Sequence, residues 1–351
     1  MHKVKQESEK LDVTDLWYQS RLRITDEFAA PPIILKIDDS IIGTLGNFSA
    51  STGKAKSKKT FNICAIVAAA LNNGTVLNYN ATLPEKKRRI LYVDTEQSPF
   101  HCLRVLNRVL LLAEFPITSH PESLEFLSLR RHAPNIRIKI IEEAIYKTEC
   151  LGLVIIDGIR DLAYDINSPS EATDLITKLM QWTDERQIHI HTVLHLNKGD
   201  DNTRGHIGTE LNNKAETVLQ VTKDDIDKDI SIVTSMFIRD MDFEPFAFRI
   251  NESSLPELIE DYEPQQPMKK KGFDYKEVSE VKHREALESV FSIGDSLSYG
   301  LLIERLRSCY RAVGCECGVN KTKDLKKFLA YKRMIIQGED KRYCYNRNFH
   351  Y

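Results

Sequence analysis

Strand-like and helix-like segments alternate along most of the chain, and this alternation restricts the fold more than any other feature of the sequence. The run LGLVIID, residues 151–157, has the apolar character of a central parallel strand covered on both faces. Parallel strands need a crossover connection, usually a helix, so the alternation predicts βαβ units and a mostly parallel sheet. The predicted strands are residues 33–37, 47–52, 89–95, 124–129, 151–157 and 189–196, and the predicted helices are residues 60–72, 98–113, 136–149 and 169–186.

The pattern changes after residue 210. The segments AETVLQVTK, ISIVTSMFIRD and FAFRI follow one another as strands with turn residues between them, which predicts an antiparallel extension of the sheet. The segment ESSLPELIEDYEPQQPMKKKG is rich in proline, glutamine and charge, as linkers are.

The end of the chain has helical patterns in residues 275–291, LLIERLRSCYRAVG and KTKDLKKFLAYK, followed by a hairpin candidate, MIIQGEDKRYCYN. This order resembles a winged-helix module. The length of 351 residues leaves room for more than one domain. The predicted organisation is a leader at 1–30 with a short helix in LWYQSRL, an α/β domain at 31–252, a linker at 253–273 and a winged-helix-like domain at 274–351.

The composition is that of a soluble globular protein, with 42% hydrophobic and 28% charged residues. No apolar run is long enough to span a membrane, and the N-terminal MHKVKQESEKLDV is too charged for a signal peptide, so we expect a cytoplasmic protein without a membrane partner. The seven cysteines are then best interpreted as free thiols. A four-thiolate metal site of Cys309, Cys315, Cys317 and Cys344 is the less common alternative.

Charge is distributed unevenly along the chain. From residue 269 to the end there are 18 Lys and Arg against 11 Asp and Glu, a net charge of +7, whereas the rest carries 31 against 40, a net charge of −9. A basic C-terminal region on an acidic body predicts that any contact with nucleic acid is concentrated at the C-terminal end. The alternative is a solvated basic face that has no partner.

A basic stretch with one glycine, GKAKSKKT at residues 53–60, lies between a predicted strand and the apolar helix pattern FNICAIVAAAL. A phosphate-binding loop of the form GxxxxGK(S/T) occupies this position in nucleotide-binding proteins, with backbone N–H groups and a helix N-terminus facing the phosphates. If Gly53 is the leading glycine, Lys59 binds phosphate and Thr60 ligates Mg²⁺. Only Lys58, at the second glycine, departs from the pattern.

A competing register ends the motif at Gly53 and Lys54. It fails at two positions, because Phe48 replaces the leading glycine and Ala55 replaces the metal-binding hydroxyl. A lysine-rich surface turn would explain the charge but not the placement between strand and helix. A basic side chain at residue 58 can lie outward, provided that its φ angle is not positive. The predicted nucleotide-binding residues are Gly53, Lys54, Ala55, Lys56, Ser57, Lys58, Lys59, Thr60 and Phe61.

Acidic residues end two of the predicted strands. Asp157 closes LGLVIID, about 100 residues beyond the loop and on an expected parallel neighbour of the loop strand, where it can hold Mg²⁺ through water. The run RILYVDTEQS carries Asp94 and Glu96 at its end. An ATPase needs a carboxylate at a strand tip to accept a proton from the attacking water, and Glu96 is the candidate base. The alternative is a solvated strand end.

Polar residues also end the last of these strands, in HTVLHLNKG. His195, Asn197 and Lys198 could sense the terminal phosphate of a nucleotide, although a lone histidine near a strand end is more often structural. The following stretch, DDNTRGHIGTELNNKAE, contains Arg204 and is either a mobile DNA-facing segment or a surface loop.

The order of phosphate loop, DTE, LVIID and LHLNKG…RG resembles that of the RecA-like ATPases, and within them the RepA-type hexameric replicative helicases of plasmids. The stretch RGHIGTELNNKAE is similar to the RGSSAL-type segment that follows HHxxKG in that group, with one histidine kept. GNFSASTGKAKSKKT also resembles a loop variant of ATPases carried by bacterial mobile elements. The resemblance covers about residues 30 to 250 and implies a RecA-like P-loop core that binds ATP and Mg²⁺.

In this family Lys59 would bind phosphate and Glu96 would be the base. Thr60 and Asp157 would handle Mg²⁺. The resemblance gives His195 the role of a sensor.

A basic residue late in the sheet reaches the ATP of a neighbouring subunit as an arginine finger in ring helicases. Arg239, in SMFIRDMDF, matches that placement first and Arg204 second. The resemblance therefore implies a homo-oligomer, a hexameric ring, that acts on single-stranded or duplex DNA.

Three functions are consistent with these patterns. The leading hypothesis is a DNA-dependent, helicase-like ATPase in replication or mobilisation of a plasmid or integrated mobile element. The second is a DNA-binding regulator in which ATP is a structural switch and the C-terminal module reads a DNA site. A small-molecule kinase shares the loop but leaves the strands after residue 210 and the basic module unexplained.

Overall fold

The computed structural model describes residues 12–196, 205–260, 262, 274–275, 278–315 and 318–349. The chain divides into two compact units, Met1–Pro264 and Gln265–Tyr351, and the division lies inside the segment that the sequence predicts as a linker. Within the described ranges, no helix is both long and apolar enough to cross a membrane.

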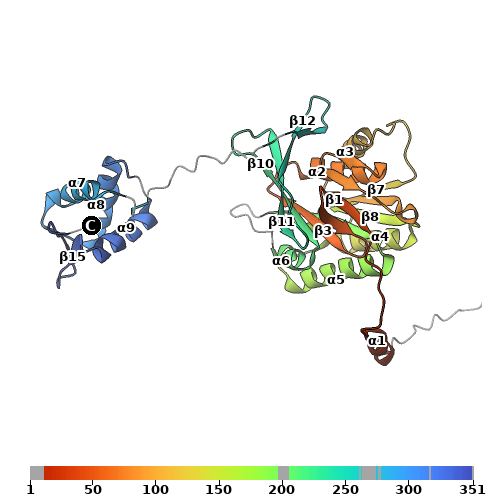
Figure 1. Cartoon of the computed structure of the whole chain (residues 1–351), viewed down its shortest axis with the longest axis horizontal. Helices are drawn as coiled ribbons and strands as arrows, with labels where there is room; N and C mark the ends of the chain where they lie inside the picture. Colours follow the sequence, from red (N-terminus) through yellow and green to blue (C-terminus); the bar gives the residue numbers. More distant parts are fainter. Residues whose placement is uncertain are drawn as a thin grey trace, which may run out of the picture. The chain divides into compact units, whose positions relative to one another are not determined.

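The first unit is built on a sheet of nine strands in the described part of the chain (Figure 1). The six strands from β10 to β7 are parallel, and β11, β12 and β13 continue the sheet antiparallel beyond β10. The predicted mostly parallel sheet with an antiparallel extension is confirmed. The order is β13 (Pro256–Ile259), β12 (Phe246–Ile250), β11 (Ile230–Ile238), β10 (Thr217–Lys223), β3 (Phe48–Gly53), β9 (His189–His195), β8 (Leu151–Asp157), β6 (Arg89–Asp94) and β7 (Leu124–Ser128).

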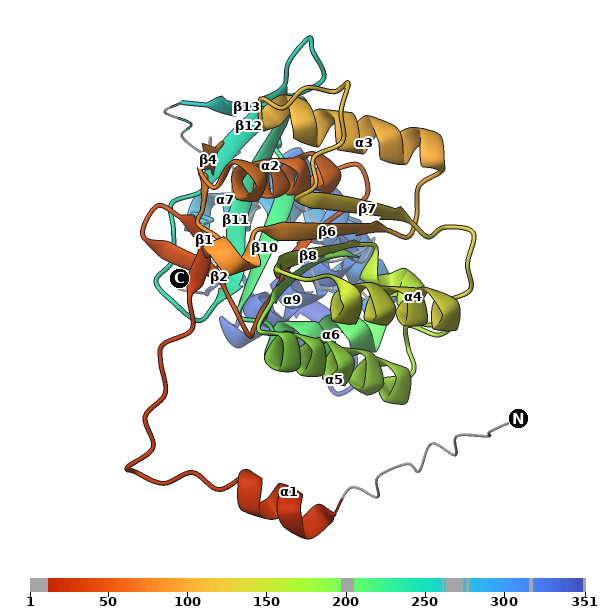
Figure 2. The same ribbon diagram turned by 90° about the vertical axis from the view of Figure 1, so that its right-hand side faces the viewer.

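Helices cover both faces of this sheet (Figure 2). The helices α2 (Lys59–Asn72) and α3 (Pro99–Leu112) pack on one face, and α4 (Pro134–Lys147), α5 (Pro169–Arg186) and α6 (Gly205–Lys214) pack on the other. All seven residues of β8 are buried, as its apolar sequence requires for a strand between two helical layers. Serine and proline fix the start of α5, because Ser168 caps the helix and Pro169 is its first residue.

One predicted strand belongs elsewhere. Residues 33–37, expected among the alternating strands, form β1 (Ile33–Ile37) of a separate antiparallel sheet in the order β2-β1-β5-β4. The reason is local: two residues, including Asp38 with a φ of 50°, connect β1 to β2 (Ser40–Thr44), and such a short connection makes a hairpin rather than a crossover. The other strands of this sheet are β4 (Thr75–Val76) and β5 (Tyr79–Ala81).

The remaining elements of the first unit are short. The predicted N-terminal helix is present as α1 (Val13–Gln19), which begins before LWYQSRL and ends inside it. Single 3₁₀ turns precede β6 and follow β8, at η1 (Glu85–Lys87) and η2 (Ile159–Leu162). β13 forms within the segment that the sequence predicts as a linker, because it pairs with β12.

The second unit has a hydrophobic core of its own. Its elements follow the order helix, strand, helix, helix, strand, strand, with the strands joined as an antiparallel sheet in the order β14-β16-β15. This arrangement is winged-helix-like, as predicted. The elements are α7 (Glu280–Val290), η3 (Phe291–Ile293), β14 (Ser296–Leu297), α8 (Tyr299–Ala312), α9 (Val319–Tyr331), β15 (Ile335–Gln337) and β16 (Tyr343–Tyr345).

Buried polar side chains join β3 to β9 beneath the end of β3. The ring of His189 donates from Nδ1 to the Thr44 carbonyl, 2.9 Å away, so its Nε2 accepts from Ser49 Oγ at 2.7 Å. This series of hydrogen bonds continues from Ser49 Oγ to His191 Nδ1 at 2.7 Å and from His191 Nε2 to Ser51 Oγ at 2.8 Å. Both rings are fully buried, and burial lowers the pKa of His189 to about 4 and that of His191 to about 3.

Because His189 and His191 are buried in the neutral form, we expect the free energy of unfolding to fall in acid. Their folded-state pKa lies below the ordinary value of about 6.5, so the unfolded chain binds protons first as pH falls below 6.5. Each ring is expected to lower the free energy of unfolding by about 2 kcal/mol between pH 6.5 and pH 5. Asp157 acts in the opposite direction, because burial raises its folded-state pKa to about 7 and protonation then favours the folded state.

Urea unfolding of wild type and Asp157→Asn at pH 7 and pH 5 checks this expectation. The variant lacks the opposing carboxyl, so its stability should fall more steeply toward pH 5 than that of wild type. Equal slopes in the two proteins would show that the Asp157 carboxyl does not titrate with the raised pKa.

Candidate functional site

The loop between β3 and α2 lies at the carboxyl edge of the sheet, the edge where the parallel strands end. Ser57 N donates to the Lys54 carbonyl at 3.2 Å and closes a turn within the loop. Gly53 starts the loop where no side chain fits, because a Cβ atom there would lie 2.2 Å from the Val221 carbonyl oxygen and 2.7 Å from Ser57 Oγ. The leading glycine of the predicted motif is therefore required by close approach to β10.

Lys58 adopts a left-handed backbone conformation, with φ 67° and ψ 29°, immediately before α2. From the sequence, an outward side chain at residue 58 is expected only if the φ of that residue is not positive. This condition is wrong, because the φ of Lys58 is positive. Glycine adopts this conformation without strain, whereas a residue with a Cβ pays roughly 1–2 kcal/mol. The side chain does lie away from the loop, because its Nζ donates to the Asp229 carbonyl in the β10–β11 connection.

Two substitutions at residue 58 separate the effect of its positive φ from that of its side-chain contact. Lys58→Gly and Lys58→Ala both remove the contact to Asp229, but only glycine relieves the positive φ. The glycine variant should therefore unfold about 2–4 °C above the alanine variant in a thermal scan. Because Nζ is held by Asp229, ATP affinity measured by calorimetry should stay near the wild-type value in both. An equal loss of ATP affinity in both variants would instead make Lys58 a phosphate contact.

Lys59 is buried and turned toward the loop. Its Nζ donates to the Gly53 carbonyl at 2.8 Å and to the Lys54 carbonyl at 3.0 Å, and lies 3.1 Å from His195 Nδ1. Burial lowers the pKa of Lys59 to about 8, against the opposing effect of the nearby Asp157 and Glu96 carboxylates. An ammonium held by its own loop is in place to receive an anion.

Asp157 ends β8 beside the start of α2. One carboxylate oxygen, Oδ2, accepts from Thr60 Oγ1 at 3.3 Å and from the Tyr92 hydroxyl at 2.9 Å. Burial, and next the nearby Asp94, raise the pKa of Asp157 to about 7. A hydroxyl and a carboxylate are ligands that Mg²⁺ accepts, and neighbouring ligands in its octahedron lie about 3 Å apart, so Thr60 and Asp157 fit this ion.

Glu96 lies on a turn that Asp94 holds. The Asp94 carboxylate accepts from the backbone N–H of Glu96 at 3.0 Å and of Gln97 at 2.7 Å, and from Gln97 Nε2 at 2.8 Å. Thr95 Oγ1 ties the same turn to the end of β8 by donating to the Gly158 carbonyl at 2.9 Å. Asp94 is thus a positioning residue, and the Glu96 side chain is left to project into the site.

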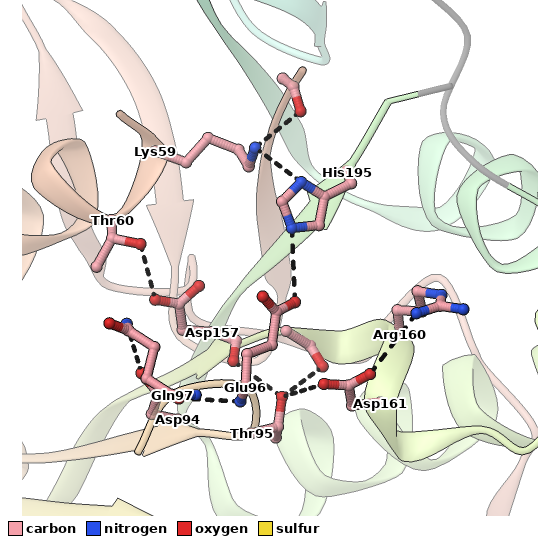
Figure 3. A network of polar contacts seen from close by, with 12 residues as sticks. Lys59, Thr60, Asp94, Thr95, Glu96, Gln97, Asp157, Arg160, Asp161 and His195 are labelled. Atoms are coloured by element: carbon pink, nitrogen blue, oxygen red, sulfur yellow. Dashed lines mark hydrogen bonds and ion pairs between the residues drawn. The ribbon is translucent and has the colours of Figure 1, made fainter. Parts of the chain in front are cut away.

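His195 lies between the loop and this turn (Figure 3). Its Nδ1 faces the Lys59 ammonium, which can only donate, so a neutral ring carries its proton on Nε2. Nε2 lies 3.5 Å from Glu96 Oε1, and the hydrogen bond from His195 is the first cause of the lowered pKa of Glu96. His195 therefore connects Lys59 to the candidate base Glu96.

A pocket of about 370 Å³ opens at these side chains. One wall is residues 56–61 of the loop and of α2, with Glu96, Asp157 and His195 beside it. The other wall is the α3 surface, where the Arg108 guanidinium lies 3.8 Å from the centre of the Phe61 ring. The α3 residues that line the pocket are His101, Arg104, Val105 and Arg108.

Comparison with known proteins agrees with this geometry. The model of the AAA domain family matches residues 20–201, which is more than half of the chain. The chain belongs to the AAA domain family. With the strand–loop–helix geometry of Gly53–Thr60, this membership makes the first unit a P-loop domain of the ATPase class.

Other comparisons add little to the family match. Among solved structures, the crystal structure of the RadB recombinase is similar to this chain at 14% identity and a TM-score of 0.42, over 60% of this chain and 90% of that chain. No curated protein matches the chain.

The AAA domain brings most of the predicted site residues to one edge. Pairing of β3 with β9 places Gly53 opposite His195, and pairing of β6 with β8 places Asp94 opposite Asp157. The expectation that β8 is a direct neighbour of the loop strand is wrong, because β9 lies between β3 and β8.

Arg239 lies apart from these residues. It follows β11, whose end pairs with the first residue of β10, so it is at the edge opposite to the phosphate loop. Its backbone N–H donates to the Glu216 carbonyl at 3.2 Å and its Nη2 donates to the Lys214 carbonyl at 3.0 Å. Arg204, Asn197 and Lys198 lie outside the described residues.

Sequence patterns missed several residues of the site. Tyr92 is an inward-facing member of β6, and Thr95 and Gln97 stand inside the DTEQ turn, where only their contacts reveal a role. The α3 residues have no motif, although arginines at 104 and 108, one helical turn apart, mark one face of the helix. Within the described residues no group of three or more His, Cys, Asp and Glu side chains could hold a metal ion, and Cys317 of the four-cysteine alternative lies outside them.

Proposed function

We propose that the chain is a RecA-like, ATP-hydrolysing motor that acts on DNA, of the RepA-type helicase group, in replication or mobilisation of a plasmid or mobile element. The observation that carries the proposal is the meeting of Lys59, Asp157 and Glu96 at the carboxyl edge of a parallel sheet, around one pocket. A phosphate lysine, a metal carboxylate and a second carboxylate are the parts that ATP hydrolysis needs.

The proposed mechanism assigns one task to each group. The loop N–H groups and Lys59 bind the phosphates, and Lys59 gives up the Gly53 and Lys54 carbonyls for phosphate oxygens. Mg²⁺, held by Thr60 and Asp157, would supply neutralisation of charge on the terminal phosphates. Glu96 orients the attacking water and takes its proton. The lowered pKa of Glu96 keeps the side chain an ionised carboxylate at neutral pH, the form that can accept a proton.

His195 is proposed to report the state of the nucleotide. A phosphate that draws Lys59 away from Nδ1 removes one of the two contacts that hold the ring, and the Glu96 contact then changes with it. This agrees with the sensor role that the sequence resemblance implies.

Assembly into a hexameric ring, with Arg239 as a finger toward the ATP of a neighbouring subunit, is part of the proposal. The position of Arg239 opposite to the phosphate loop of its own chain supports a role in trans over one in cis.

An ATP-switched DNA-binding regulator is the second candidate. The second unit favours it, because it has its own core and its helix α9 exposes Lys323 and Lys327 beside Tyr331. Helices of this kind enter the major groove of duplex DNA in helix-turn-helix proteins. A regulator would bind duplex DNA in the presence of ATP without hydrolysis that DNA stimulates.

The experiment that separates the two measures ATP hydrolysis and particle size together, with and without single-stranded DNA and duplex DNA. The motor predicts hydrolysis that rises with single-stranded DNA and a particle of several subunits with ATP. Duplex binding by a monomer that releases no phosphate would favour the regulator and would overturn the motor.

A further inference from the structure

We propose that Arg130 and Arg131 form a second phosphate-binding site, for the backbone of single-stranded nucleic acid. Hydrogen bonds through Asp94 connect this site to the turn that carries Glu96. The inference rests on the proposed function, because it names the contact through which DNA would act on hydrolysis. It concerns the loop between β7 and α4, residues 129–133, called the arginine loop below.

The arginine loop is a tight turn with its arginines at the tip. His132 N donates to the Leu129 carbonyl at 3.0 Å, which makes Arg130 and Arg131 the two central residues of a four-residue turn. Both side chains are exposed, and within the described part of the chain neither guanidinium makes a hydrogen bond or an ion pair. Two adjacent arginines with donors to spare are suited to phosphate oxygens.

A third arginine makes the loop rigid. Arg137 lies on α4 with a side chain 11% exposed, and it donates to the carbonyls of Leu129 at 3.1 Å and Arg130 at 2.9 Å. Its remaining donor reaches the Asp161 carbonyl at 2.7 Å, on the turn after β8. A loop held by side-chain donors loses little conformational entropy when a ligand binds.

The arginines line a pocket of about 310 Å³ with Ser98, Pro99 and Ser128. Its residues come from the carboxyl edge. At this edge β6 and β7 end and α3 and α4 begin (Figure 2). The Ser98 hydroxyl contacts His101 Nδ1 at 2.9 Å, and none of the side chains that the structure describes caps the first turn of α3. The positive end of the helix dipole thus adds to the charge of the two arginines.

Two further contacts, both made by Asp94, join the arginine loop to the candidate base. The Asp94 backbone carbonyl accepts from Leu129 N at 2.8 Å, while the Asp94 carboxylate holds the backbone N–H of Glu96 at 3.0 Å. Ser98 and Pro99 of the pocket directly follow Glu96 and Gln97 of the nucleotide site. A phosphate bound by the arginine loop therefore acts on the turn that aims Glu96.

Phosphate at this position could come from nucleic acid or from the nucleotide of a neighbouring copy. Nucleic acid is favoured because the arginines are adjacent, exposed and carried on an open surface pocket, which suits successive phosphates of a strand more than a single enclosed triphosphate. The test distinguishes the two sources.

The test uses the full chain with Arg130→Ala/Arg131→Ala, and Lys86→Ala/Arg88→Ala as a matched control. The control pair removes the same charge from exposed side chains at the amino end of β6, away from the pocket. Fluorescence anisotropy with a labelled oligothymidine measures affinity across a salt series, and hydrolysis is followed with and without that oligonucleotide. Arg130→Lys/Arg131→Lys separates charge from the paired donors of arginine.

Loss of two phosphate contacts should weaken oligonucleotide binding by about tenfold or more at low salt and reduce the slope of log affinity against log salt by about 1.4. Stimulation of hydrolysis by the oligonucleotide should fall with it, the lysine variant should be intermediate, and the control should match wild type. Wild-type affinity and salt slope in the alanine variant would overturn the site.

A second outcome would assign the arginines to the nucleotide of a neighbouring copy and would overturn the nucleic-acid assignment. In that outcome the alanine variant binds the oligonucleotide as wild type does, but its rate of hydrolysis per subunit no longer rises with protein concentration. A wild-type protein that hydrolyses no ATP would refute the proposed function, and the anisotropy series would still decide the arginine site.

Discussion

Lys59→Ala is expected to weaken ATP binding by at least about 30-fold, as loss of one partner from a buried charged contact costs about 2–5 kcal/mol. Lys59 is the buried cation of the pocket, and its ammonium faces the Gly53 carbonyl at 2.8 Å until phosphate takes that place. Isothermal titration calorimetry with ATP and Mg²⁺ measures the loss. Hydrolysis should disappear with it.

The same variant should unfold no more easily than wild type in the absence of ATP. Burial lowers the pKa of Lys59 because the ammonium loses hydration in the folded chain, so we expect its removal to cost no stability. Loss of ATP binding without loss of stability therefore separates a functional lysine from a structural one.

Lys54→Ala is the matched control, because Lys54 is the phosphate lysine of the competing register and is exposed on the same loop. Wild-type affinity in Lys54→Ala supports Gly53, Lys59 and Thr60 as the working residues. The reverse result, with binding lost at residue 54 and kept at residue 59, would establish the competing register.

Glu96→Gln is expected to slow hydrolysis by about 10²–10⁴-fold while ATP still binds, which is the range for loss of a general base. The amide keeps the size of the side chain and an oxygen that can accept from His195 Nε2, 3.5 Å from the carboxylate in the wild-type chain. It cannot take a proton from water. Single-turnover hydrolysis of bound ATP measures this step apart from binding.

Glu125→Gln serves as the control for this variant, since Glu125 is an exposed carboxylate on β7 outside the nucleotide pocket. Hydrolysis at the wild-type rate in Glu96→Gln would remove Glu96 from the mechanism. Asp161 would then be the next residue to test. Its carboxylate lies 3.4 Å from Oγ1 of Thr95, the residue that precedes Glu96.

The fold was predictable where a segment has one clear pattern. The apolar run 151–157 is typical of a strand covered on both faces, and it is the fully buried β8. The segment 33–37 has an equally clear strand pattern, yet its place in a separate sheet depends on the two-residue connection to β2. Sequence periodicity identifies a strand, whereas its partner is decided by turns and by distant pairing.

The site was predictable where chemistry needs a residue type at a strand end. Glu96, Asp157 and His195 end three strands of one parallel sheet, and the sheet brings them together. Lys58 was not predictable in this way, because its positive φ is imposed by the loop and has no signature in the side chain. The role of Arg137 was not predictable either, because it donates to the backbone carbonyls of Leu129 and Asp161, which only the fold brings within reach.

The central claim is that this site hydrolyses ATP, and the most direct measurement is phosphate release from wild type and Glu96→Gln in a single turnover, with and without single-stranded DNA. Wild type is expected to release phosphate, faster with DNA, and Glu96→Gln is expected to bind ATP equally and release almost none. ATP held by wild type without phosphate release, with or without DNA, would contradict the claim.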